Sequence, residues 1–227
     1  MMSLIARIAE REATVLGGPP RHPGGARKSV TDSCQKARIA AIFATAIRPC
    51  NKIGAMKRLY LLRHAKAQIA EPDMDDFDRP LAPRGRRTAP RVGAYMRLLG
   101  YRPDIALCSP AARALETWVL LRDALGCEIE EEFRDEIYSA APRTLLDCVR
   151  GLDDRHASAI LVGHNPGILT LALGLVGRGI GSANPFGKYP TCALTVFDFD
   201  VGRWRDVAPG GGILIGFTRP RELDAVA

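Results

Sequence analysis

The sequence predicts an α/β fold, a three-layer α/β/α sandwich around a mostly parallel central sheet. The first observation is an alternation of strand-like and helix-like segments that begins at Met56. Strands that alternate with helices are typical of a layered sheet with mostly parallel strands. The second observation is that 47% of the 227 residues are hydrophobic, which is enough for one sizeable core.

Short apolar runs place four strands of this sheet. The runs at 58–63, 103–109 and 158–164 are largely apolar, as expected for strands that are buried on both faces. The run at 127–133 alternates between apolar and charged residues instead, which indicates a more exposed strand.

Prolines that follow a capping residue mark the start of two connecting helices. Ser109-Pro110 and Asn165-Pro166 each place a capping side chain before a proline at the first helical position. Another helix contains Pro90, which should kink that helix or shift its start. The helices are predicted at about 84–99, 110–125, 142–151 and 166–176.

The C-terminal part of the chain is predicted to add two strands. Residues 191–200 form the first, and a short partner near 203–207 would be joined to it near Gly202. The segment 209–216 contains several glycines without a strand-to-helix context, so we expect a loop there and not a nucleotide-binding turn.

The basic charge of the chain is concentrated in residues 1–55. This segment carries nine Lys/Arg and three Asp/Glu residues, a net charge of +6, whereas residues 56–227 carry a net charge of +1. We expect 1–55 to be a basic extension, with a short helix at about 34–48, and 56–227 to be the folded domain. A disordered tail, a cleaved targeting segment and an upstream start codon are the three interpretations of the extension.

Composition excludes several classes of function. The nearly neutral domain gives no electrostatic argument for nucleic-acid binding. No apolar run approaches the ~20 residues of a membrane helix. The six cysteines lack CxxC spacing, which argues against a zinc site and a disulfide framework and favours a reducing, cytoplasmic setting. The oligomeric state stays open.

Four basic residues follow strands of the predicted sheet at its carboxyl edge. Arg63 and His64 end the first strand, Arg113 lies in the first turn after the second, and His164 ends the fourth. Ligands of open α/β sheets bind at this edge. Two arginines and two histidines would repel one another in an empty site, whereas a tetrahedral anion such as phosphate would bind between them.

Each of these residues has another interpretation when it is taken alone. A histidine at a strand end is often a structural residue, and an arginine in a first helical turn is usually a surface charge. A pair of histidines also suits a metal ion, but adjacent arginines and few carboxylates oppose a cation. The chain contains no Walker loop, GxGxxG turn or GxSxG elbow. The combination therefore favours a phosphate site that needs no metal or other cofactor.

The segments that carry these residues resemble a known family. "LYLLRHAKA" at 59–67, "SPAARALET" at 109–117 and "LVGHNPG" at 161–167 are similar, in order and spacing, to the motifs of the histidine phosphatases, the phosphoglycerate mutase-like superfamily. Arg-His-Ala in place of the usual Arg-His-Gly, with "DRPLAPRG" at 78–85, resembles the SixA-type phosphohistidine phosphatase branch. The resemblance spans residues 56–205 and implies a phosphoglycerate mutase-like fold.

The resemblance also implies a role for each residue of the site. His64 matches the nucleophile, which carries the phosphoryl group on a ring nitrogen during turnover. Arg63 and Arg113 match the arginines that bind the phosphate. His164 matches the second histidine, which hydrogen-bonds the phosphoryl oxygens.

A general acid is implied by position alone. Glu136 in "RDEIYSA" follows the third strand, as the acid does in many superfamily members, and its neighbour Asp135 is the alternative. The acidic stretch 71–78 either borders the pocket or is a solvated loop. The implied substrate is phosphohistidine in a protein, whose imidazole leaves with little help from an acid. The alternatives are a small phosphorylated metabolite and a non-catalytic module that binds a phospho-ligand.

Overall fold

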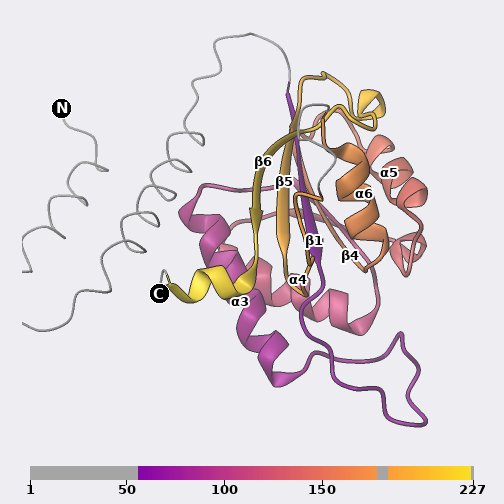
Figure 1. Cartoon of the computed structure of the whole chain (residues 1–227), viewed down its shortest axis with the longest axis vertical. Helices are drawn as coiled ribbons and strands as arrows, with labels where there is room; N and C mark the ends of the chain where they lie inside the picture. The colour runs from indigo at the N-terminus through magenta and orange to yellow at the C-terminus, as the bar shows by residue number, and fades with distance from the viewer. Residues whose placement is uncertain (1–55, 178–183, 226–227) are drawn as a thin grey trace, which may run out of the picture. The chain divides into compact units, whose positions relative to one another are not determined.

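The structure is a computed structural model that describes residues 56–177 and 184–225 (Figure 1). The predicted extension 1–55 and its helix at about 34–48 lie outside the described residues. The described residues include all five candidate site residues.

A six-stranded sheet forms the centre of the described residues, and its strands lie in the order β3-β2-β4-β1-β5-β6 (Figure 1). The first four strands of this order are mutually parallel, whereas β5 and β6 are antiparallel to their neighbours. The prediction of a mostly parallel sheet is confirmed. The strands are β1 Lys57–Arg63, β2 Ile105–Cys108, β3 Glu130–Phe133, β4 Ser158–Gly163, β5 Leu194–Phe199 and β6 Ile213–Thr218.

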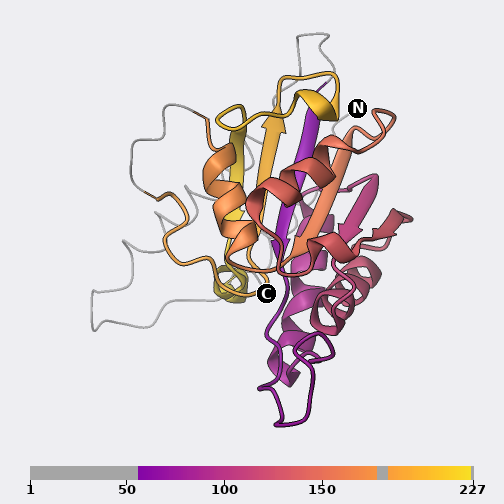
Figure 2. The ribbon, with the colours of Figure 1, turned by 90° about the vertical axis from the view of Figure 1, so that its right-hand side faces the viewer.

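Within the described residues, four α-helices cover the two faces of the sheet. Figure 2 shows α5 and α6 in front of the sheet, and the core contacts place α3 and α4 behind it. The predicted three-layer α/β/α arrangement is thereby confirmed. None of the helices in this part of the chain is both long and apolar enough to cross a membrane. The helices are α3 Pro83–Leu98, α4 Ala112–Leu125, α5 Pro142–Arg150 and α6 Gly167–Leu175.

β1 explains why the sheet needs both helical layers. Its side chains alternate between the faces, so that Leu59 and Leu61 pack into the core under α5 and α6. Tyr60 and Leu62 pack into the core under α3 and α4. All four side chains are at most 2% exposed. A strand that is apolar on both faces can therefore be stable only between two layers of helices.

The pairing of β1 with β4 places the functional edge. The two strands are parallel, with Arg63 opposite Gly163. The residues that follow them, His64 and His164, therefore emerge next to each other at the carboxyl edge. The predicted convergence of the two strand ends is confirmed.

The two capping predictions at Ser109 and Asn165 are wrong. The helices begin later, with α4 at Ala112 and α6 at Gly167, and neither has a side-chain cap. The physical reason is that neither side chain bonds an N–H inside the helix: the Ser109 hydroxyl accepts from the N–H of Ala111, the residue before α4, at 3.4 Å, and both side chains bond distant partners. The Ser109 hydroxyl hydrogen-bonds a ring nitrogen of His164 at 2.9 Å, and the Asn165 amide donates to a loop carbonyl at 3.3 Å.

The predicted strand near 203–207 is also wrong. Residues Trp204–Asp206 form a short 3-10 helix, because the Trp204 side chain is fully buried and its indole donates to the His156 carbonyl at 2.8 Å. The true partner of β5 is β6, inside the segment 209–216 that was expected to be a loop and two residues beyond it. The helix α3 runs through Pro90 and begins at Pro83.

Candidate active site

His64 directly follows β1 and is fixed through its backbone. Its N–H donates to the Gly163 carbonyl and its carbonyl accepts from the Cys192 N–H, both at 3.0 Å. The Nδ1 atom of its buried ring lies 2.7 Å from the Ala65 carbonyl oxygen. Because a carbonyl only accepts, Nδ1 carries the proton and Nε2 keeps its lone pair.

His164 follows β4 and lies beside His64, with 5.0 Å between the ring centroids. Its Nε2 is 2.9 Å from the Ser109 hydroxyl. Its Nδ1 is buried and has no hydrogen-bond partner among the described residues. A buried polar atom without a partner is costly unless a ligand completes it. His164 therefore offers one ring nitrogen to a ligand.

Arg63 brings a guanidinium group to the same edge. Its Nη1 donates to the Tyr189 carbonyl at 2.8 Å, and its Nε is buried without a partner in the described part of the chain. The buried position lowers the pKa of Arg63. The guanidinium is held in place by the loop and keeps donor capacity for an anion.

Arg113 comes from the first turn of α4 and is 5% exposed. Its Nη2 donates to Oδ2 of Asp76 at 2.8 Å, and its Nη1 donates to the backbone carbonyl of the same residue. The guanidinium also lies 5.8 Å from the Tyr138 ring centroid. This arginine is therefore paired with a carboxylate in the structure.

Asp76 contacts the site residue Arg113, although nothing in the sequence distinguishes it from the neighbouring acids. It also accepts a hydrogen bond from the Tyr138 hydroxyl at 2.9 Å, and Arg79 donates to its Oδ1 at 2.5 Å. The hydrogen bond from Arg79, followed by those from Tyr138 and Arg113, lowers the pKa of Asp76 to about 2. The ionised Asp76 carboxylate thus binds its loop to Arg113 and Tyr138.

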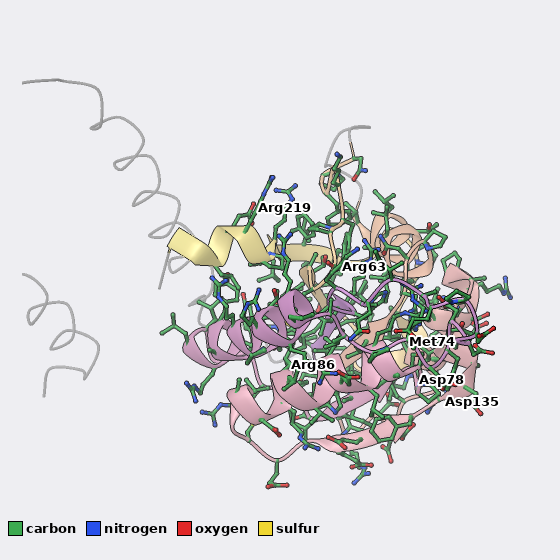
Figure 3. All side chains as sticks on the ribbon, turned by 90° about the horizontal axis from the view of Figure 1, so that it is seen from below. Arg63, Met74, Asp78, Arg86, Asp135 and Arg219 are labelled. Atoms are coloured by element: carbon green, nitrogen blue, oxygen red, sulfur yellow. The ribbon has the colours of Figure 1, made fainter. Side chains whose placement is uncertain are left out.

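Tyr138 joins this loop to the opposite side of the site. Its ring packs against Phe77 at 5.1 Å and meets His164 edge-on at 5.5 Å, measured between centroids. Figure 3 views the carboxyl edge from below, with Asp78 of the loop and Asp135 of the following 3-10 helix on one side of Arg63. The rings of Phe77 and Tyr138 and the Asp76 carboxylate therefore lie together beside His164.

The surroundings of the two histidines favour their neutral forms. Burial, followed by the neighbouring His164, Arg113 and Arg63, lowers the pKa of His64 to about 3. Burial and the Arg113 guanidinium lower the pKa of His164 to about 4, although Asp76 acts in the opposite direction. Both rings are therefore uncharged at pH 7.

The structure brings together four of the five residues expected from the sequence: Arg63, His64, Arg113 and His164. Glu136 is different, because it is exposed on the 3-10 helix Asp135–Ile137 and forms no hydrogen bond or ion pair with the described site residues. Burial, and after it the charge of Glu136, raises the pKa of Cys148 on α5. The alternative residue, Asp135, is exposed as well.

The signal for Asp76 was present in the acidic stretch 71–78. That stretch contains five carboxylates, and no spacing rule identifies the one that folds back onto Arg113. Within residues 56–177 and 184–225, no three His, Cys, Asp or Glu side chains gather in a metal-binding cluster. The donors that do converge, guanidinium groups and ring nitrogens, suit an anion.

Comparisons with known proteins agree with this geometry. The family model described as histidine phosphatase superfamily (branch 1) matches residues 59–138. An uncharacterized protein of Mycobacterium tuberculosis is 36% identical over 165 residues, which are 70% of this chain and 100% of that protein.

Two solved structures are similar in both sequence and fold. A putative phosphohistidine phosphatase SixA from Agrobacterium tumefaciens is 33% identical with a TM-score of 0.63, over 72% of this chain and 98% of that one. A putative phosphohistidine phosphatase SixA from Nakamurella multipartitia is 28% identical with a TM-score of 0.63, over 73% and 96% of the two chains. The similarities support a phosphatase with a phosphoglycerate mutase-like fold. The chain therefore belongs to the histidine phosphatase superfamily, in its SixA-like branch.

Proposed function

We propose that the chain hydrolyses a phosphoryl group in two transfers, first to His64 and then to water. The lone pair of His64 Nε2 attacks phosphorus in line, and the bond from phosphorus to the leaving atom breaks with its electron pair on the leaving group. Water then attacks the phosphohistidine, the P–N bond breaks, and inorganic phosphate leaves. The observation that carries the proposal is the hydrogen bond from His64 Nδ1 to the Ala65 carbonyl, which leaves the lone pair on Nε2. The lowered pKa of His64 agrees with a neutral ring.

Arg63, Arg113 and His164 are the proposed phosphate-binding residues. Arginine offers forked donors that match the spacing of phosphoryl oxygens. A bound dianion would raise the pKa of His164, so that the ring gains a proton and donates from Nδ1, the atom without a partner. The charge that develops on the equatorial oxygens is then met by three cationic groups.

Glu136 and Asp76 are the two candidates for the general acid. Glu136 follows from its position in the sequence, whereas the hydrogen bonds to Arg113 and Tyr138 favour Asp76. An acid must reach the leaving atom. Arg79, Tyr138 and Arg113 together lower the pKa of Asp76, so Asp76 can donate a proton only if substrate binding displaces these partners. Glu136→Gln and Asp76→Asn compared on an alkyl phosphate would separate the two.

We propose phosphohistidine in a protein as the substrate. The name of the Agrobacterium relative supports it, and so does the exposed position of Glu136, because an imidazole leaving group makes little demand on an acid. A small phosphomonoester is the alternative substrate, and a non-catalytic module that binds a phospho-ligand is a weaker one. We further propose a reducing, cytoplasmic setting, which agrees with the four free cysteines among the described residues.

The test is a phosphatase assay in EDTA, with p-nitrophenyl phosphate and a phosphohistidine-bearing protein as substrates. We expect turnover by the wild type, fastest on phosphohistidine, and none by His64→Ala, which should fold normally. Turnover of the aryl ester alone would move the substrate to small phosphomonoesters. Loss of activity in EDTA would contradict metal independence, and activity of His64→Ala would contradict the nucleophile.

A further inference from the structure

Thr117 is a buried polar residue for which the proposed function leaves no role. It lies on α4, one helical turn after Arg113, and is 0% exposed. Its hydroxyl donates to the Arg113 carbonyl at 2.6 Å and accepts from the Ala65 N–H at 2.9 Å. Both capacities of one hydroxyl group are therefore used, one within the helix and one across to another segment.

The second of these hydrogen bonds crosses between the two halves of the site. Ala65 follows the nucleophile His64, and its carbonyl is the acceptor for His64 Nδ1 at 2.7 Å. Arg113 is the arginine at the start of the same helix. One hydroxyl thus links the backbone that carries the phosphate-binding guanidinium to the backbone that orients the nucleophilic ring.

We propose that Thr117 is a positioning residue, which aims His64 Nε2 at the phosphate held by Arg113. It acts through Ala65: the hydrogen bond from the Ala65 N–H to Thr117 anchors the peptide between His64 and Ala65, which limits how far the Ala65 carbonyl can move from His64 Nδ1. This carbonyl selects the Nδ1-protonated tautomer of His64. This inference rests on the proposed function, since it assigns a supporting residue to the same nucleophile.

The site offers no obvious substitute for the hydroxyl. Ala65 and Thr117 are each 0% exposed, so water from the solvent does not reach the Ala65 N–H in this arrangement. A buried N–H without an acceptor is unfavourable, and the segment would shift to find one. A shift of about 1 Å in a reacting group can lower a rate by about 100-fold. The residue after Ala65 is also held in place, because the Lys66 carbonyl accepts a hydrogen bond from the Ala82 N–H at 2.8 Å.

A purely helical role for Thr117 is the alternative, and the chain contains a matched control for it. Thr88 on α3 makes the same bond to the carbonyl four residues earlier, Arg84, at 2.7 Å. Thr88 is only partly buried and its hydroxyl has no second partner in the described part of the chain. Thr88→Val removes the intrahelical bond alone, whereas Thr117→Val also removes the bond to Ala65.

The experiment compares the full-length wild type with Thr117→Val, Thr117→Ser and Thr88→Val. We measure kcat on p-nitrophenyl phosphate, the rate of His64 phosphorylation, the Kd of inorganic phosphate and the pH profile of kcat/KM. We expect Thr117→Val to lower kcat and the phosphorylation rate by about 10- to 100-fold. The Kd of phosphate should change by less than about threefold, because the Arg113 side chain is not touched. Thr117→Ser should restore most of the rate, and Thr88→Val should match the wild type.

A second readout reports on the tautomer directly and needs no turnover. The 15N chemical shifts of His64 should show a proton on Nδ1 in the wild type and in Thr117→Ser, and a mixture of tautomers in Thr117→Val. An unchanged tautomer and an unchanged kcat in a folded Thr117→Val protein would overturn the inference, and so would equal losses in kcat and phosphate binding. A wild type without turnover, or an active His64→Ala, would instead contradict the proposed function, while the tautomer measurement would still test Thr117. If Thr117→Val does not fold, Thr117→Ser decides: a serine variant with a slow, mixed-tautomer His64 overturns the inference.

Discussion

Replacing His64 with asparagine should make the protein less sensitive to acid, although the ring sits in the middle of the site. In the folded chain the His64 pKa is lowered from 6.5 to about 3 by burial and by His164, Arg113 and Arg63. Between these two values the unfolded chain binds a proton that the folded chain does not. Stability is therefore lost as the pH falls below 6.5, and the loss continues until about pH 3.

The magnitude follows from the two pKa values. At pH 5 the protonation of an unfolded histidine with a pKa of 6.5 favours unfolding by about 2 kcal/mol, whereas at pH 7 the effect is well below about 1 kcal/mol. His164, with a pKa of about 4 in the folded chain, adds a similar amount. The wild type should thus lose about 4 kcal/mol from the two rings between pH 7 and pH 5, and His64→Asn about half of that.

The assay is urea denaturation at pH 7, 6 and 5 in a buffer free of phosphate, because phosphate would bind the folded site. The double variant His64→Asn/His164→Asn serves as the control and should show the flattest dependence on pH. Equal losses of unfolding free energy in the wild type and in His64→Asn would refute the reasoning, since the ring would then titrate alike in both states.

Three further predictions concern the surroundings of the two rings. Asp76→Ala should tighten the binding of inorganic phosphate about fivefold in calorimetry. The variant removes the half-exposed carboxylate that competes with phosphate for Arg113, an ion pair of about 1 kcal/mol. Weaker binding would mean that the carboxylate helps to hold the ligand. Ser109→Ala should lower kcat by about tenfold and destabilise the protein by about 1–3 kcal/mol, since it leaves the buried His164 Nε2 without its partner; an unchanged kcat would contradict this. Gly85→Ala should destabilise the protein by about 1–3 kcal/mol in thermal unfolding, because a Cβ atom there would lie 2.3 Å from the Lys66 carbonyl oxygen; a stable variant would show that α3 can move away.

The sequence was informative where one physical rule fixes the outcome. The four residues before Arg63, Leu59 to Leu62, are all apolar, so they had to belong to an interior strand. The carboxyl ends of parallel strands then had to meet at one edge of the sheet. That is why His64, His164 and Arg113 were found together. Glu136 remains a proposal from position, because both carboxylates of the 3-10 helix Asp135–Ile137 are exposed and the sequence does not show which of them a substrate would meet.

The features that the sequence did not predict depend on contacts between distant residues. Ser109 has the local signature of a helix cap, but a histidine more than fifty residues later takes its hydroxyl. Asp76 is one of several acids in a loop, and only the folded position of Arg113 selects it. The strand β6 was hidden because the glycines before Ile213 outweighed the apolar residues that follow them. Local patterns do not encode which of two partners a polar side chain finally meets.

The central position of β1 also has a consequence for biosynthesis. The strand that ends at the nucleophile is paired with β4 on one side and with β5 on the other, so it finds its neighbours about 100 or more residues later in the chain. Contacts of such long range form late, and a growing chain emerges from the ribosome in order. A nascent or truncated chain that stops before Leu194 lacks the β5 partner of β1. Phosphatase activity would therefore appear only once β5 has been made and has paired with β1. Measured activity would thus indicate that the sheet is complete.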